Sequence, residues 1–217
     1  MVMKGQFLER PTLIPVGELV LEGISHRGDQ RPGLLVLPPP PVEGGGMDTV
    51  VGAELAWAIS HRGHPTLRFN YRGVGASQGQ PSRQVEDWLA DARAALELAR
   101  DNAGGAAPVV ATLGASDAVG LKLAGLEKIS GLVFINPSIV RGRDLFGLPA
   151  SGCELAVVVA EHDATQDRVA WSGAMQDLGG EFTVVPGANR AFQRNLPMVG
   201  KAVGALVERA GRALPTG

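Results

Sequence analysis

The feature that most constrains the fold is a regular alternation of apolar segments of strand length with amphipathic segments of helix length. Residues 33–37 are a continuous apolar run, typical of a β-strand that is covered on both faces. A loop rich in proline and glycine follows at 38–46. Asp48 can then cap a helix that ends near Gly63, with an apolar stripe formed by Val51, Leu55, Ala58 and Ile59.

This alternation continues through the rest of the sequence. The patterns predict strands over residues 18–24, 33–37, 66–70, 109–113, 131–135, 155–159 and 182–185. They predict a further helix after a cap at Ser82, in which Glu86, Asp91 and Arg93 are largely solvated. Two more helices are predicted over residues 117–126 and 164–178. A closing helix has one apolar face, formed by Val199, Val203, Leu206, Val207 and Ala210. Strands separated by helices indicate an α/β fold, a doubly wound and predominantly parallel sheet flanked by helices.

Length and composition favour one globular domain, residues 1–217, because 45% of the residues are apolar and 19% are charged. A formal net charge of −2 and a pI near 6.1 argue against a nucleic-acid partner. No basic block suggests a membrane surface, and no apolar run suggests a membrane span or a signal peptide. The single cysteine, Cys153, is expected to be a small core residue. We therefore expect a cytoplasmic protein without a cofactor or metal, and the oligomeric state stays open.

The stretch at 112–120 places a serine, Ser116, where an apolar strand gives way to a helix. It approximates the Gly-x-Ser-x-Gly nucleophile elbow of α/β-hydrolases, with Gly114 before the serine and Ala118 in place of the second glycine. Such a turn exposes the serine hydroxyl at the carboxyl end of a parallel strand, where ligands of these sheets bind. The alternative is that Ser116 is only a small residue at a tight turn.

Four segments, in order along the chain, resemble small, lidless bacterial α/β-hydrolases related to dienelactone hydrolases. The segment at 68–79 resembles their Arg-Phe-Asn-Phe-Arg-Gly-Val-Gly-x-Ser-x-Gly sequence, and 44–48 resembles their Gly-Gly-x-Met-Asp helix start. Residues 160–163 resemble the Gly-Glu-x-Asp segment that carries the catalytic acid, and 186–192 resemble the Pro-Gly-Ala-Asp-His-Phe-Phe segment that carries the catalytic histidine. The connection 137–152 is too short for a separate lid domain, so we expect an open site.

The resemblance implies a degenerate catalytic triad. Ser116 stands at the nucleophile position and Asp163 at the acid position, but Arg190 occupies the histidine position. A guanidinium keeps its proton and cannot act as the general base that a serine nucleophile needs. We expect Arg190 to pair with Asp163. His162 borders Asp163 and is the alternative base, whereas His26, His61 and His64 are expected away from the site.

The oxyanion hole is also expected to be impaired. In this family the segment after the first parallel strand donates one backbone N–H, and the residue after the nucleophile donates another. Here the first segment is four consecutive prolines at 38–41, and the donor position falls at Pro40, which has no N–H. Only the Asp117 N–H is left as an expected oxyanion donor.

Two functions follow from the sequence. The first is a catalytically impaired hydrolase-fold protein, a pseudo-hydrolase, that binds a small-molecule ligand or a protein partner. The alternative is an active serine hydrolase that cleaves small ester substrates with Ser116.

Overall fold

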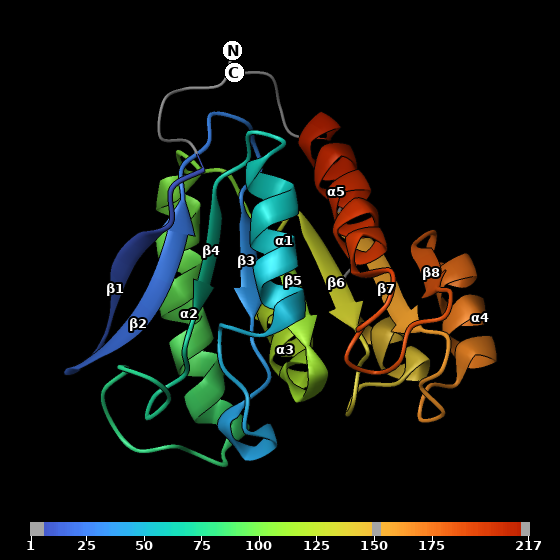
Figure 1. The fold of residues 1–217 in the computed structure, drawn as a ribbon, viewed down its shortest axis with the longest axis horizontal. Helices are drawn as coiled ribbons and strands as arrows, with labels where there is room; N and C mark the ends of the chain where they lie inside the picture. The colour runs from blue at the N-terminus through green and yellow to red at the C-terminus, as the bar shows by residue number, and fades with distance from the viewer. Residues whose placement is uncertain (1–6, 149–152, 214–217) are drawn as a thin grey trace.

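An eight-stranded sheet forms the centre of the computed structural model, which describes residues 7–148 and 153–213 (Figure 1). Across the sheet the strand order is β1-β2-β4-β3-β5-β6-β7-β8. The pairs β1–β2 and β2–β4 are antiparallel, and every other pair is parallel. The strands are β1 (Arg10–Val16), β2 (Leu19–His26), β3 (Leu34–Leu37), β4 (Thr66–Phe69), β5 (Val109–Leu113), β6 (Gly131–Ile135), β7 (Glu154–Ala160) and β8 (Glu181–Val185). The predicted doubly wound, predominantly parallel sheet is confirmed.

Helices cover both faces of this sheet. Because successive side chains of a strand point to opposite faces, Leu34 and Val36 of β3 pack into one apolar core and Leu35 and Leu37 into another. The first core lies under helices α1 (Val50–Ser60) and α5 (Leu196–Arg212). The second lies under α2 (Val85–Asn102), α3 (Asp117–Leu126) and α4 (Arg168–Leu178). Figure 1 shows α1 and α5 side by side in front of the sheet.

The winding direction reverses next to β3. The chain runs from β3 through α1 to β4 on one side, and then through α2 to β5 on the other side of β3. A crevice at the carboxyl ends of the strands is expected at such a switch point, because the connections leave β3 and β5 in opposite directions. The candidate site described below lies there.

Element boundaries agree with the sequence predictions most closely in the middle of the chain, where β5, α3 and β6 have the predicted bounds. Three helix starts differ. The α1 cap is Thr49 rather than Asp48, since Thr49 Oγ1 accepts the Gly52 N–H at 3.1 Å. Helix α2 begins after Gln84 rather than Ser82, and α4 begins at Arg168, capped by Asp167. The edge strand β1 was not predicted.

Asp91 of α2 is not solvated, contrary to the sequence prediction. Its side chain is fully buried and holds Arg72, whose Nη2 lies 2.7 Å from Asp91 Oδ1 and whose backbone N–H donates to Oδ2 at 2.9 Å. Asp87 adds a second carboxylate, 2.8 Å from Arg72 Nη1. These contacts of Arg72 with Asp91 and Asp87 hold the loop after β4 against α2.

The connection from β6 to β7 contains one 3₁₀ segment, Gly142–Gly147, and residues 149–152 of it lie outside the described residues. Cys153 follows, half-buried and packed against the second core, where burial raises the pKa of its thiol to about 11. Within residues 7–148 and 153–213, none of the helices has both the length and the apolar character that a membrane span requires.

Candidate functional site

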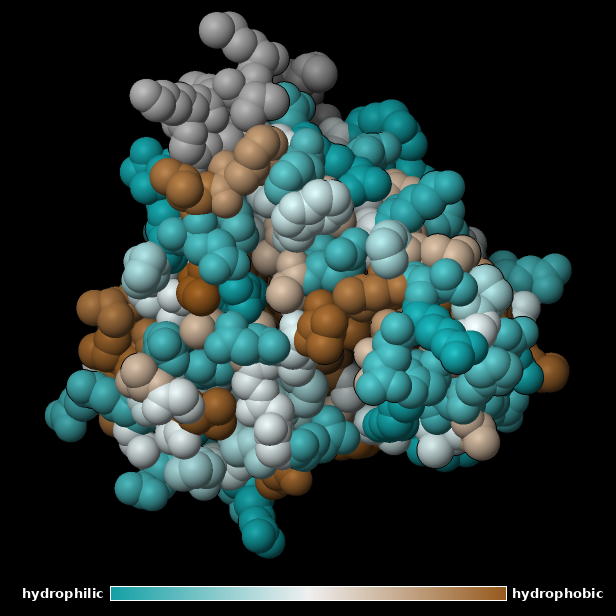
Figure 2. Space-filling model, viewed as in Figure 1, coloured by the Kyte–Doolittle hydropathy of each residue, from teal (hydrophilic) through white to brown (hydrophobic). Residues whose placement is uncertain are grey.

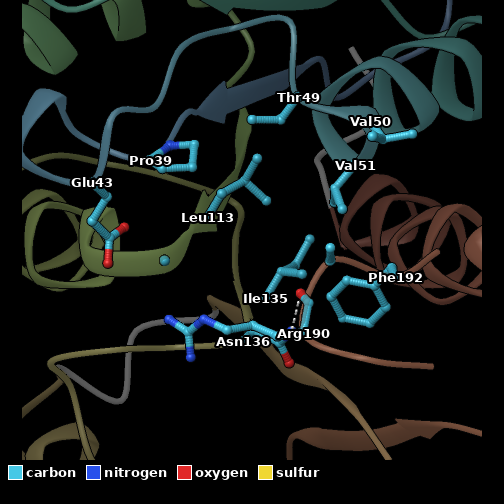
Figure 3. Close-up of a pocket in the computed structure, with 12 residues that line it drawn as sticks. Pro39, Glu43, Thr49, Val50, Val51, Leu113, Ile135, Asn136, Arg190 and Phe192 are labelled. Atoms are coloured by element: carbon cyan, nitrogen blue, oxygen red, sulfur yellow. Dashed lines mark hydrogen bonds between the residues drawn. The ribbon is translucent and has the colours of Figure 1, made fainter. Parts of the chain in front are cut away.

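A pocket of about 430 Å³ opens at the carboxyl ends of β3, β5 and β6 (Figure 3). Its walls are largely apolar, and its only charged lining side chains in the described part of the chain are Glu43 and Arg190. The lining residues are Pro39, Glu43, Thr49, Val50, Val51, Leu113, Gly114, Ile135, Asn136, Arg190, Ala191 and Phe192. A small molecule can therefore enter at the switch point of the sheet.

The turn between β5 and α3 has its apex at Gly114. Gly114 follows the last residue of β5 and has φ +56°, in the left-handed region that favours glycine. Ser116 already has the helical φ of −69° and ψ of −5°, and α3 begins at the next residue. The residue that turns the chain and faces the pocket is thus Gly114.

Ser116 is buried behind this turn. Its side chain has 0% exposure, its Oγ donates to the Pro38 carbonyl, and the Tyr71 hydroxyl lies 2.9 Å from the same Oγ. Burial raises the pKa of Tyr71, although its hydrogen bond to Ser116 opposes that shift. The expectation that the turn exposes the Ser116 hydroxyl is therefore wrong. This hydroxyl instead ties the loop after β3 to the start of α3.

Glu43 was not among the predicted site residues, yet it lies against the apex of the turn. The proline-rich loop folds into a 3₁₀ turn, Pro41–Glu43, closed by a 2.9 Å hydrogen bond from the Glu43 N–H to the Pro40 carbonyl. Glu43 Oε2 then accepts the Ala115 N–H at 3.0 Å. A Cβ atom added to Gly114 would collide with that Oε2 atom. The carboxylate thus fills the space that a side chain at position 114 would need.

Asp117 points away from the pocket. Its Oδ2 accepts three backbone N–H groups of the loop after β6, from Ser138 at 2.6 Å, Ile139 at 2.7 Å and Val140 at 3.1 Å. Burial raises the pKa of this carboxyl, and the three hydrogen bonds oppose that shift. The Asp117 N–H, which the sequence suggested as an oxyanion donor, donates to the Gly114 carbonyl inside the turn.

Asp163 and Arg190 are paired, as predicted. Arg190 Nη1 lies 3.2 Å from Asp163 Oδ2, and its Nη2 donates to Ser138 Oγ at 2.7 Å. Thr165 donates its hydroxyl to Asp163 Oδ1 at 2.7 Å. Burial acts to raise the pKa of Asp163, but the hydrogen bonds from Thr165 and the positive charge of Arg190 outweigh it and lower the pKa. Asp163 is buried, whereas the Arg190 side chain is 48% exposed and reaches the pocket.

Asn136 fixes the backbone beneath the guanidinium. Its Nδ2 donates to the Arg190 carbonyl at 2.8 Å, and its Oδ1 accepts the Ala160 N–H at 2.9 Å. These bonds join the carboxyl ends of β6 and β7 to the loop that carries Arg190, so the guanidinium is attached to a constrained segment.

The histidines do not reach Ser116. The His162 side chain is 65% exposed, and its Nε2 lies 3.8 Å from Glu161 Oε2. His26 and His64 are bonded to Thr66 and Pro32, near the amino ends of the parallel strands, and His61 to the Trp57 carbonyl on α1. Among the described residues, the hydrogen-bond partners of Ser116 Oγ are Pro38 and Tyr71 alone. None of these histidines is hydrogen-bonded to the serine.

Structural comparison relates the whole sheet and its helices to known hydrolases. An alpha-beta serine hydrolase homologue from Coxiella burnetii superimposes with a TM-score of 0.76 at 22% identity, covering 94% of this chain and 98% of that one. The lidless serine hydrolase XC6422 from Xanthomonas campestris gives a TM-score of 0.73 at 25% identity, with 96% of each chain covered.

This protein has the α/β-hydrolase fold. A dienelactone hydrolase from Anabaena variabilis shares this fold with a TM-score of 0.72 at 12% identity, covering 93% of this chain and 97% of that one. No protein-family model and no curated protein matches the sequence. Residues 7–148 and 153–213 contain no group of three or more His, Cys, Asp or Glu side chains that could hold a metal ion.

Proposed function

We propose that this protein is a pseudo-hydrolase that binds a small molecule in the pocket beside Gly114 and does not carry out serine-hydrolase chemistry. The observation that carries the proposal is the turn after β5, where a glycine stands at the apex and the Glu43 carboxylate occupies the adjacent space. In a nucleophile elbow, the strained residue between strand and helix is the one that presents the nucleophile. A glycine there has no nucleophilic atom to offer.

The other parts of the reaction machinery support the same proposal. A catalytic serine needs a base within hydrogen-bond reach, and an oxyanion needs free N–H donors aimed at it. Arg190 lies against the acid Asp163, where it cannot accept a proton. The Ala115 N–H, which follows the apex residue, is already bonded to Glu43. The base is thus replaced by Arg190, the nucleophile by Gly114, and the Ala115 N–H is occupied by Glu43.

The size and lining of the pocket suit a small-molecule ligand. Its volume of about 430 Å³ lies within the range of small-molecule sites, and its apolar walls with two charged side chains match their usual lining. The pocket also lies at the switch point of the sheet, where ligands of such folds bind.

Turnover of short-chain aryl esters tests the loss of chemistry. We expect wild-type protein and S116A to show the same rate, equal to the rate of uncatalysed hydrolysis. A wild-type rate well above that background, abolished in S116A, would overturn the proposal and establish the alternative, an active serine hydrolase that uses Ser116.

The position of the turn apex can be tested by rebuilding the triad. The triple variant E43A/G114S/R190H removes the blocking carboxylate and supplies a nucleophile and a base at the positions assigned here. We expect a fluorophosphonate to label this variant at position 114, while R190H alone stays unlabelled. Labelling of R190H at Ser116 would show that the apex is wrongly assigned.

A further inference from the structure

The charges around the pocket do not balance, and this imbalance indicates what the ligand carries. Arg190 is neutralised by Asp163, whose Oδ2 lies 3.2 Å from the Arg190 Nη1. Among the described residues, the Glu43 side chain forms no ion pair, and it accepts one hydrogen bond, from the Ala115 N–H to Oε2. Within the described residues, no cationic side chain therefore neutralises the Glu43 charge, and its Oε1, for which no donor is found there, can accept a hydrogen bond.

Glu43 is also held in place. The 3₁₀ turn Pro41–Glu43 constrains its backbone, and the hydrogen bond from Ala115 fixes one carboxylate oxygen at the apex of the turn. A carboxylate already held in position loses less conformational freedom when a ligand binds than a mobile one does. Glu43 is exposed to solvent, but this hydrogen bond holds its carboxylate beside the pocket.

The opposite side of the pocket is apolar. Figure 3 shows the charged ends of Glu43 and Arg190 on one side, and Val51, Ile135 and Phe192 on the other. This arrangement suits a ligand with a cationic end beside Glu43 and an apolar or aromatic body against the far wall, since burial of the body removes apolar surface from water.

We propose that the pocket binds a small organic ammonium ion, with its N–H groups donating to Glu43 Oε1 and its hydrocarbon body packed against Val51, Ile135 and Phe192. This inference rests on the proposed function, namely that the pocket holds a small molecule. It adds the charge of that molecule. A carboxylate ligand is disfavoured, because it would meet the unneutralised Glu43 charge beside an arginine already paired with Asp163.

Three probes of nearly equal size test the inference: phenethylammonium, 2-phenylethanol and phenylacetate. Binding is followed by NMR titration of the methyl groups of Val51, Leu113 and Ile135, which line the pocket. We expect phenethylammonium to bind about fivefold more tightly than 2-phenylethanol, the upper end of what an ion pair with a solvent-exposed carboxylate supplies. Phenylacetate should bind most weakly. Added salt should weaken only the binding of the ammonium ion appreciably.

The variant E43Q separates charge from shape, because its amide oxygen can still accept the Ala115 N–H. It should reduce the affinity for phenethylammonium to that for 2-phenylethanol and leave the alcohol unaffected. E97Q is the matched control, since Glu97 is an exposed glutamate of α2 on the other face of the sheet, and it should change neither affinity.

The outcomes distinguish the two proposals. Equal affinities for the ammonium ion and the alcohol, or an unchanged preference in E43Q, overturn the cation inference while pocket binding stands. If none of the three probes shifts the pocket methyl groups at millimolar concentration, both this inference and the proposed small-molecule site are overturned.

Discussion

Replacing Ser116 by alanine tests whether this serine has a structural role. The Ser116 hydroxyl donates to the buried Pro38 carbonyl and lies 2.9 Å from the Tyr71 hydroxyl, and both Ser116 and Tyr71 are at most 1% exposed. S116A leaves a carbonyl and a phenol without this partner in a buried place, and each such group costs about 1–3 kcal/mol. We expect the free energy of unfolding to fall by about 2–3 kcal/mol, and Tm by about 5–10 °C for a chain of this length.

Urea denaturation at pH 7 measures this change, with two further variants to assign its cause. Y71F removes only the hydroxyl group of the tyrosine ring, so it should lower the free energy of unfolding by about 1 kcal/mol. In the double variant Y71F/S116A no phenol is left unpaired, so its destabilisation should be smaller than the sum of the single values by about 1 kcal/mol. S172A is the control, because Ser172 is an exposed residue of α4. S116A within about 0.5 kcal/mol of wild type would refute the structural role, because that is the range of ordinary surface substitutions.

Three further predictions concern the same region and its supports. G114A should destabilise the protein by about 2 kcal/mol or more, because φ at Gly114 is +56° and the new Cβ collides with Glu43. In urea denaturation, the double variant E43A/G114A should recover part of this loss, and no recovery would contradict the assigned contact. Because the pKa of Asp163 is lowered in the folded state, its ionised form stabilises the fold above the unfolded pKa of about 3.9, and this contribution is lost as the pH falls through the folded pKa. The free energy of unfolding of D163N should therefore fall less than that of wild type between pH 5 and pH 2. Equal losses would refute this linkage. D91N should cost about 2 kcal/mol, because it replaces the buried carboxylate that binds Arg72 by a neutral amide and leaves Asp87 as the one charged partner described for that guanidinium. A loss below about 0.5 kcal/mol in thermal unfolding at pH 7 would contradict this pairing.

The fold could be predicted from the sequence because its signals are local. A continuous apolar run sets β5, and the small residues and apolar spacing after it set α3, so both elements have the predicted bounds. Strand β1 gave a weaker signal, since Pro11 and Pro15 interrupt its pattern. Proline is tolerated there because β1 is an edge strand, and on its outer side no strand of the described residues pairs with it.

The site was predicted only in part because its decisive contacts join distant segments. Asp163 and Arg190 came from two motifs in family order, and their pairing followed from charge. Ser116 was assigned to the exposed position by its residue type, although the predicted end of the strand at Leu113 already implied that Gly114 turns the chain. Glu43 and Asp91 carried no such signal. Each is positioned by a group from another segment, Glu43 by the Ala115 N–H and Asp91 by Arg72.

Labelling with a fluorophosphonate tests most directly whether this hydrolase fold has lost its nucleophile. Intact-protein mass spectrometry after incubation with excess reagent measures the fraction of protein that carries an adduct, and peptide mapping locates it. With Gly114 at the apex and Ser116 buried, we expect no adduct on wild-type protein under conditions that label an active serine hydrolase completely. Rapid, stoichiometric modification of Ser116 would contradict the proposal.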